Sequence, residues 1–298
     1  MRGAWFAGTV LIAGCSTLLG ITDPSTRTDG GGSGSDGSGS GSDGGSGSDG
    51  GGSDVGQPGA SPVLLSEVVL APTDGEMVEI VNTSPDPIDL SHYFLADNGN
   101  YWRVPVGTPI TDTNDFVAQF PNGTILPGHG VFTIAVATAA EFLLNYGIAP
   151  TFSIADGELT RITGGSLPNL TSGGEVIVLF FWDGSSDTVQ DADIMLAGSP
   201  SALNSLVNKS SAQQDGPDAD SATTAYQIDA GSITIQQGTP GSGLSTKRIA
   251  VEAGHEVHAG NGNGLAGEDE TSEDTAVTWD SVVFSIPDPG LVPAALLQ

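Results

Sequence analysis

Two groups of carboxylates in the C-terminal third of the chain have the residue types of a metal site. They are Asp215, Asp218 and Asp220 in the run DGPDADS, and Asp269, Glu270 and Glu273 in the run GEDETSED. Oxygen ligands on loops are what Ca²⁺ takes in proteins, although neither run has the glycine and glutamate positions of an EF-hand loop. We therefore expect either a solvated acidic surface or a loop-bound calcium ion that holds the C-terminal region.

The single cysteine of the chain, Cys15, has a different chemistry. It follows Arg2, an apolar run at 4–13 and small residues, which is the layout of a secretory signal. The residues Ile12-Ala13-Gly14-Cys15 resemble the lipobox of bacterial lipoproteins, and this resemblance implies that Cys15 is lipidated. We expect a lipoprotein signal peptide at 1–15 and attachment to the outer membrane or cell surface. The alternative is an ordinary signal peptide and a secreted protein.

The charge and the cysteine content exclude several classes of function. Seven Lys and Arg residues stand against 36 Asp and Glu residues, giving a net charge of −29, which argues against nucleic acid as a partner. One cysteine cannot form an intramolecular disulfide or a zinc site built on several thiolates. A GxGxxG pattern at 262–267 is followed directly by Glu268, Asp269 and Glu270, which would repel a phosphate. We expect no bound nucleotide.

The segment 16–60 is rich in Gly, Ser and Asp and has little to bury, so we expect a disordered tether. The run GGSGSD at 31–36 and 44–49 matches the start of the calcium-binding nonapeptide repeat. That repeat needs a large apolar residue two places after its aspartate, where this chain has Ser38 and Gly51. The tether is therefore the better interpretation.

After residue 61 the sequence changes to short apolar runs separated by turn residues, which is typical of antiparallel all-β domains. The strands we expect are at 63–70, 76–82, 92–97, 101–105, 131–137, 175–182, 232–236 and 278–287. One helix is also expected, because Thr138 and Glu141 have the spacing of a capping box and Gly147 can end the helix. The fold class that we predict is an immunoglobulin-like antiparallel β-sandwich with one short helix and a C-terminal β-extension.

Five segments match, in order, a known family. They are LLSEVV, GEMVEIVN, IDLSHYFLAD, FPNGTILPGHGVFTIA and LTSGGEVIVLFFWDG. Together they resemble the lamin tail domain, which implies an immunoglobulin-like sandwich at about 61–198, followed by a β-rich extension at 199–298. The chain departs from the family at His92 and at 171–175, which would alter loop surfaces. The nucleic-acid contacts of animal lamin tails are not carried over, because the charge here has the wrong sign.

From these features we expect a non-enzymatic, surface-anchored lipoprotein that presents a β-sandwich for binding or structural roles in the cell envelope. Its partners would be the membrane, through the lipid anchor, and an extracellular protein or glycan. Two alternatives stay open. The chain could be a hydrolase or the accessory module of one, with an active site that no motif reveals, or an envelope component without a discrete ligand.

Overall fold

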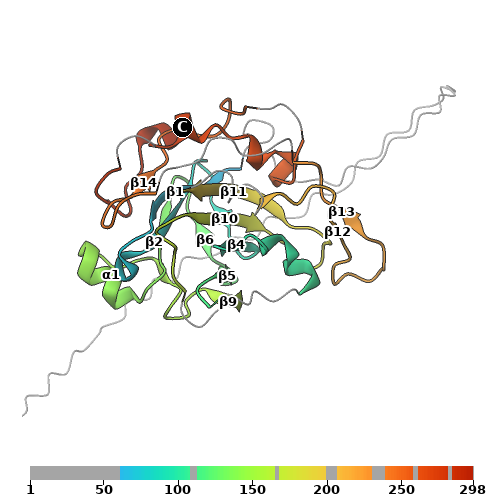
Figure 1. Ribbon diagram of the computed structural model, residues 1–298, viewed down its shortest axis with the longest axis horizontal. Helices are drawn as coiled ribbons and strands as arrows, with labels where there is room; N and C mark the ends of the chain where they lie inside the picture. The colour runs from blue at the N-terminus through green and yellow to red at the C-terminus, as the bar shows by residue number, and fades with distance from the viewer. Residues whose placement is uncertain are drawn as a thin grey trace, which may run out of the picture. The chain divides into compact units, whose positions relative to one another are not determined.

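A computed structural model describes residues 61–107, 113–164, 168–198, 207–229, 239–257, 261–280 and 284–297. These residues form two five-stranded sheets packed face to face (Figure 1). The strand pairs are antiparallel except for β7 and β8, which run parallel. The predicted all-β sandwich is confirmed. The expected features at Cys15, in the tether 16–60 and in the strand 232–236 lie outside the described residues.

The first sheet has the strand order β14-β1-β2-β7-β8. Its strands are β1 (Val63–Val69), β2 (Met77–Asn82), β7 (Val131–Ala135), β8 (Phe152–Ser153) and β14 (Thr246–Lys247). The register of β1 against β2 shifts between Leu65 and Glu67, which marks a β-bulge. At this bulge the backbone of Leu65 turns toward side chains of the second sheet.

The second sheet has the order β11-β10-β4-β5-β9. Its strands are β4 (Tyr93–Ala96), β5 (Phe116–Gln119), β9 (Thr160–Gly164), β10 (Glu175–Phe181) and β11 (Gln190–Ala197). Along β10 the side chains alternate as a pleated strand requires. Ile177 and Leu179 enter the core between the sheets, whereas Val178 and Phe180 belong to a second apolar cluster on the outer face.

That outer face is partly covered by segments distant in sequence. The 3₁₀ helix η2 (Tyr101–Val106) and the region around β12 (Gln213–Gln214) and β13 (Thr224–Ala225) bring Tyr101, Val207 and Tyr226 onto Phe94 and Phe180. The strand expected at 101–105 was wrong. Tyr101 is buried and Trp102 is half-buried, but they belong to a 3₁₀ turn that contains Pro105, a residue that cannot donate to a strand ladder.

The predicted helix is present as α1 (Ala139–Tyr146). The Thr138 side chain accepts a hydrogen bond from the Glu141 backbone N–H, the Glu141 carboxylate accepts one from the Thr138 N–H, and Gly147 ends the helix with a φ of 74°. Phe142 and Tyr146 pack against Val69 and Met77 of the first sheet. The helix therefore covers one end of the outer face of that sheet (Figure 1).

The region after residue 199 is mostly irregular where the structure describes it. Besides β12, β13 and β14 it contains η3 (Leu265–Gly267), η4 (Glu270–Ser272), α3 (Thr275–Thr278) and η5 (Ala294–Leu296). The strand expected at 278–287 was wrong in its described part, since Thr278 ends α3 and Trp279 and Ser285 form only isolated bridges. The segment, red in Figure 1, runs along the edges of both sheets, with contacts from η3 and η4 to β11.

Three short elements complete the fold. They are η1 (Thr73–Gly75), β3 (Ile88–Asp89) and β6 (Ile125–Leu126). In the part of the chain that the structure describes, no helix is long and apolar enough to span a membrane.

Candidate functional site

A buried cluster of three glutamates is the most concentrated group of titratable side chains in the described residues. Glu252, Glu268 and Glu270 each bring a carboxylate oxygen within 4.8 Å of the other two. Their exposed fractions are 1%, 8% and 2%. Glu268 lies directly after η3 and Glu270 begins η4, so a tight double turn places both carboxylates beside Glu252.

The cluster is short of hydrogen-bond donors. Among the residues that the structure describes, neither carboxylate oxygen of Glu252 and neither of Glu270 has a hydrogen-bond partner. Burial, with the neighbouring carboxylates, raises the pKa of Glu252 and Glu270 well above the ordinary 4.5. Burial likewise raises the pKa of Glu268 to about 8, although its Oε2 accepts a hydrogen bond from the Ser61 N–H at 3.1 Å.

Arg248 interacts electrostatically with Glu252, but its guanidinium is paired with other carboxylates. One guanidinium nitrogen donates to both carboxylate oxygens of Asp193 at 2.8 Å, and the other end of the group pairs with Glu273. At the bulge of β1, the Leu65 N–H donates to Asp193 Oδ2 at 2.7 Å and the Leu65 carbonyl accepts from Arg248 Nε at 2.8 Å. This network joins the edges of the two sheets.

A second buried ion pair involves Asp191, which lies two residues before Asp193 in β11. Asp191 pairs with Lys209, and the Tyr101 hydroxyl donates to Asp191 Oδ1 at 2.8 Å while it accepts from Lys209 Nζ at 3.0 Å. Tyr101 and Lys209 are 0% and 2% exposed. The second pair ties η2 and the region after residue 207 to β11.

The GxGxxG residues form the turn that holds the glutamate cluster. A Cβ on Gly264 would lie 2.8 Å from the Glu268 carbonyl oxygen and 3.1 Å from Glu270 Oε1, and a Cβ on Gly262 would lie 2.5 Å from the Cα of Asp269. The contacts with backbone atoms, at 2.8 Å for Gly264 and 2.5 Å for Gly262, exclude a larger side chain at either position. The glycines therefore serve the close packing of this loop against residues 268–270.

The acidic residues predicted around 269–273 have three different roles. Glu270 is in the glutamate cluster, Asp269 accepts hydrogen bonds from Thr271 as the N-cap of η4, and Glu273 is paired with Arg248. The sequence pattern does not predict Glu252 as a ligand, because Glu252 lies 16 residues before Glu268 and outside any acidic run. Glu268 lies in the same acidic run as Glu270.

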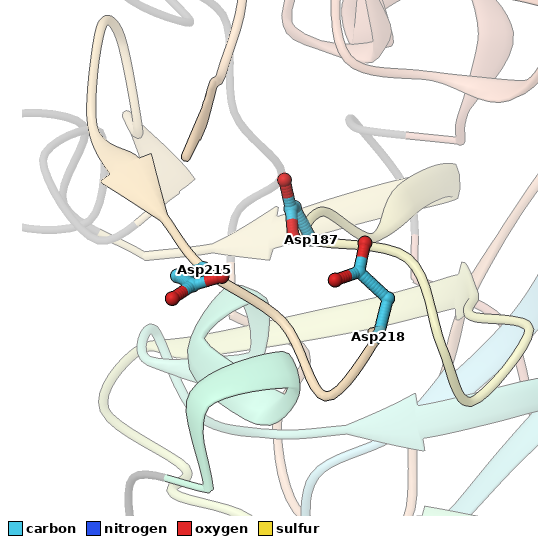
Figure 2. Close-up of side chains that lie close together, drawn as sticks. All are labelled: Asp187, Asp215 and Asp218. Carbon is cyan, nitrogen blue, oxygen red and sulfur yellow. The ribbon is translucent and has the colours of Figure 1, made fainter. Parts of the chain in front are cut away.

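The other predicted cluster is only partly assembled. Asp215 and Asp218 bring carboxylate oxygens within 4.8 Å of each other and of Asp187, which lies in the loop before β11 (Figure 2). Asp215 and Asp218 are exposed, and the Asp187 carboxylate already accepts hydrogen bonds from Gly216 N–H and Thr224 Oγ1. Asp220 does not join them and instead accepts from the Ala222 N–H. This cluster has the character of a hydrogen-bonded surface loop.

A third acidic group lies beside the N-terminal part of β10. Asp97 is 2% exposed, and its Oδ1 accepts from the Phe116 N–H at 2.5 Å while Oδ2 has no hydrogen-bond partner. Burial, together with charge repulsion from Glu175 and Asp115, raises the pKa of Asp97 to about 9, although the hydrogen bond from the Phe116 N–H opposes this rise. Burial also raises the pKa of Glu175 to about 7.

An open groove of about 530 Å³ lies on the part of the second sheet's outer face where Phe94 is found. Its apolar lining includes Phe94, Trp182 and Ile162. Its polar lining includes His92, Gln119, Asn122 and Asp183, and Gln119 pairs with Phe94 between the adjacent strands β5 and β4. The indole N–H of Trp182 donates to the Ser186 carbonyl at 2.8 Å, which fixes the ring at the edge of the groove. The groove combines aromatic surface with convergent amide and carboxylate groups.

The Asp183 carboxylate at this groove is an ionised acceptor. Partial burial would raise its pKa, but hydrogen bonds from Ser186 and Ser185 outweigh that effect and lower the pKa of Asp183 to about 2. It therefore cannot donate a proton at neutral pH.

Comparison with known proteins agrees with the architecture. Residues 57–193 match the family described as Lamin Tail Domain. Among solved structures, the chain is similar to a DUF4876 family protein from Bacteroides thetaiotaomicron, with 14% identity, a TM-score of 0.42, and 79% of this chain and 75% of that chain covered. The search of curated proteins found no match. The family match confirms the resemblance to lamin tails over residues 57–193, and the described residues have an all-β, immunoglobulin-like fold.

Proposed function

We propose that this is a non-enzymatic, lipid-anchored envelope protein whose lamin tail domain binds a neutral polysaccharide in the groove on its second sheet. The observation that carries the proposal is the lining of that groove, in which Trp182 and His92 stand beside Gln119, Asn122 and Asp183. Sugar rings present C–H faces that stack on aromatic rings, and hydroxyl groups that pair with amides and carboxylates. The groove offers both kinds of partner.

The charge of the chain favours a neutral polymer. With a net charge of −29, the protein repels anionic polysaccharides at low ionic strength. The ionised Asp183 adds a negative charge within the groove itself. A neutral sugar, by contrast, can donate its hydroxyl groups to that carboxylate.

The same carboxylate supports binding rather than hydrolysis. Glycoside hydrolysis ordinarily needs two carboxyl groups, one of which has a raised pKa and donates a proton to the leaving group. Among the described residues that line the groove, Asp183 is the carboxylic acid, and its pKa is lowered. The chemistry of the groove thus favours a binding module.

Binding to immobilised neutral and anionic envelope polysaccharides tests the proposal. We expect the purified protein to bind a neutral polymer, and Trp182→Ala to weaken this binding at least tenfold. Leu144→Ala is the control, because Leu144 is 87% exposed on α1, a helix that packs on the other sheet. Equal affinities of wild type and Trp182→Ala, or release of reducing sugars by the wild type, would contradict the proposal.

The anchor is tested separately in the native host. We expect the membrane fraction to contain a chain cleaved before Cys15 with added acyl mass, and a Cys15→Ala variant to lack that mass. Unmodified soluble wild-type protein would exclude the anchor and leave the groove to be judged on its own experiment.

A further inference from the structure

We propose that Glu252, Glu268 and Glu270 form a calcium site that fastens the C-terminal segment to the edge of the sandwich. The site lies away from the polysaccharide groove, shares no residue with it and does not rest on the proposed function. The inference rests on the geometry of the cluster, on its unpartnered oxygens and on its charge.

The geometry is that of convergent ligands. Oxygens from three carboxylates lie within 4.8 Å of one another, so one cation can contact all three. Glu252 and Glu270 are 1% and 2% exposed, and all four of their carboxylate oxygens have no hydrogen-bond partner. A buried carboxylate without a partner is among the costliest groups in a folded protein. Glu252 and Glu270 each bring an unpartnered oxygen into the cluster, and this indicates a ligand that supplies positive charge.

The charge of the surroundings supports the same conclusion. Five buried carboxyl groups interact here, namely Asp193, Glu252, Glu268, Glu270 and Glu273. Arg248 is the cation that the structure places among them, and its guanidinium is already paired with Asp193 and Glu273. When all five acids are ionised the group carries four net negative charges, and a divalent cation halves that number.

The donor set selects the kind of cation. The three side chains offer carboxylate oxygens, which suit Ca²⁺, Mg²⁺ and Mn²⁺, whereas Zn²⁺ sites are usually built from nitrogen and sulfur. Ca²⁺ accepts six to eight oxygens in irregular geometry, while Mg²⁺ demands an octahedron and keeps several of its waters. A buried cage with up to six protein oxygens from two tight turns fits Ca²⁺ better.

The site would join three parts of the chain. Glu252 follows β14, Glu268 and Glu270 belong to the η3–η4 turn, and Glu268 Oε2 also accepts from the N–H of Ser61, just before β1. The η3–η4 turn contacts β11, and the Asp191 N–H donates to the Asn263 carbonyl at 3.0 Å. An ion here would therefore fix the C-terminal segment to the start of the first sheet and to the edge of the second.

The test is calorimetric titration with CaCl₂ of the full-length protein freed of metal by chelator, together with thermal unfolding with and without calcium. We expect about one high-affinity calcium ion per chain and a rise in Tm of at least about 4 °C at saturation. Glu270→Gln keeps the size of the side chain and removes its charge, so it should abolish this rise. In chelator the same variant should be at least as stable as the wild type, because it lacks a buried acid whose ionised form is unfavourable without a cation.

Asp218→Asn is the matched control, since Asp218 is exposed in the aspartate cluster of Figure 2 and should leave the calcium response unchanged. Glu252→Gln provides a second variant of the buried site and should lose the response as Glu270→Gln does. An unchanged Tm of the wild type on adding calcium would overturn the proposal. So would a response that survives in both glutamine variants or disappears in Asp218→Asn.

Discussion

The guanidinium of Arg248 lies 2.8 Å from both carboxylate oxygens of Asp193, and both residues are 0% exposed. Arg248 directly follows β14 at the edge of the first sheet, whereas Asp193 is in β11 at the edge of the second. The bulge in β1 supplies the backbone groups of Leu65 that complete the contact. This ion pair thus links the two sheets along one side of the sandwich, where the backbone hydrogen bonds within each sheet cannot join them.

Removing this cation should be strongly destabilising. In Arg248→Met the carboxylates of Asp193 and Glu273 lose their partner while they stay buried, and breaking a buried pair in this way costs about 3–5 kcal/mol. Urea unfolding at pH 7 measures the loss. Arg103→Met is the control, because Arg103 is exposed over the Trp102 ring and should cost less than about 1 kcal/mol. Equal costs for the two variants would mean that the Arg248 network adds little to stability.

The Tyr101 hydroxyl should contribute more than an ordinary tyrosine hydroxyl. It bridges the charged groups of Asp191 and Lys209, and hydrogen bonds to charged groups contribute about 1.5–3 kcal/mol. Tyr146→Phe is the matched comparison, because the Tyr146 hydroxyl donates to the neutral Gly75 carbonyl, where about 1 kcal/mol is expected. Chemical denaturation of both variants should therefore show the larger loss for Tyr101→Phe, and the reverse order would contradict this.

The stability of the domain should fall as the pH rises, in part through Asp97. Burial raises the pKa of Asp97 to about 9 in the folded state, so between pH 4 and 9 the folded chain holds a proton that the unfolded chain has released. The stability that this bound proton contributes therefore declines as the pH rises. The side chain of the Asp97→Asn variant carries no charge at any pH. Its free energy of unfolding should therefore fall less over this range than that of the wild type. The difference between the two decreases should be about 1 kcal/mol or more, since a pKa unit corresponds to about 1.4 kcal/mol.

Unfolding curves for wild type and Asp97→Asn at pH 5, 7 and 9, in one calcium concentration, check this prediction. The difference in stability between the two proteins should change least near pH 4, where the unfolded chain still holds part of its proton, and should grow steadily from pH 5 to pH 9. Parallel pH profiles would show that Asp97 is ionised in the folded protein at neutral pH.

The N-terminus of α1 should depend on one side chain. Thr138→Ala removes the oxygen that accepts from the Glu141 N–H, and loss of such a cap costs about 1 kcal/mol. Thr138→Ser keeps that oxygen and should stay within a few tenths of a kcal/mol of the wild type. Thermal unfolding distinguishes the two variants, and an equal loss in both would assign the effect to the threonine methyl group.

Much of the sandwich follows from local patterns in the sequence. β10 alternates between the core and the outer face over its length, and α1 has both halves of its capping box, so their positions could be predicted. β11 could not, because the buried Asp191 and Asp193 interrupt its apolar pattern. Those acids are tolerated only because Lys209 and Arg248 arrive from later in the chain, which no local window contains.

The candidate site shows the same division. The acidic run predicts Glu270 as a candidate ligand. The run alone does not show that Glu270 is buried, that Asp269 is an N-cap or that Glu273 has a cationic partner. These roles depend on how the turn after Gly262 folds back on itself. The groove could not be foreseen either, since His92, Gln119 and Trp182 come from three strands or their ends, which become neighbours only in the sheet.

Residues after 207 also cover one edge of each sheet. β11 ends the second sheet, and an uncovered edge strand offers its unpaired backbone groups to any neighbouring chain. Here the Asp191 N–H is taken by Asn263, and the Val189 N–H by the Tyr226 hydroxyl. On the opposite sheet β14 shields β1 in the same way. Chains that lose this covering, by proteolysis or by truncation near residue 240, should therefore polymerise edge to edge, even where the sandwich itself stays folded.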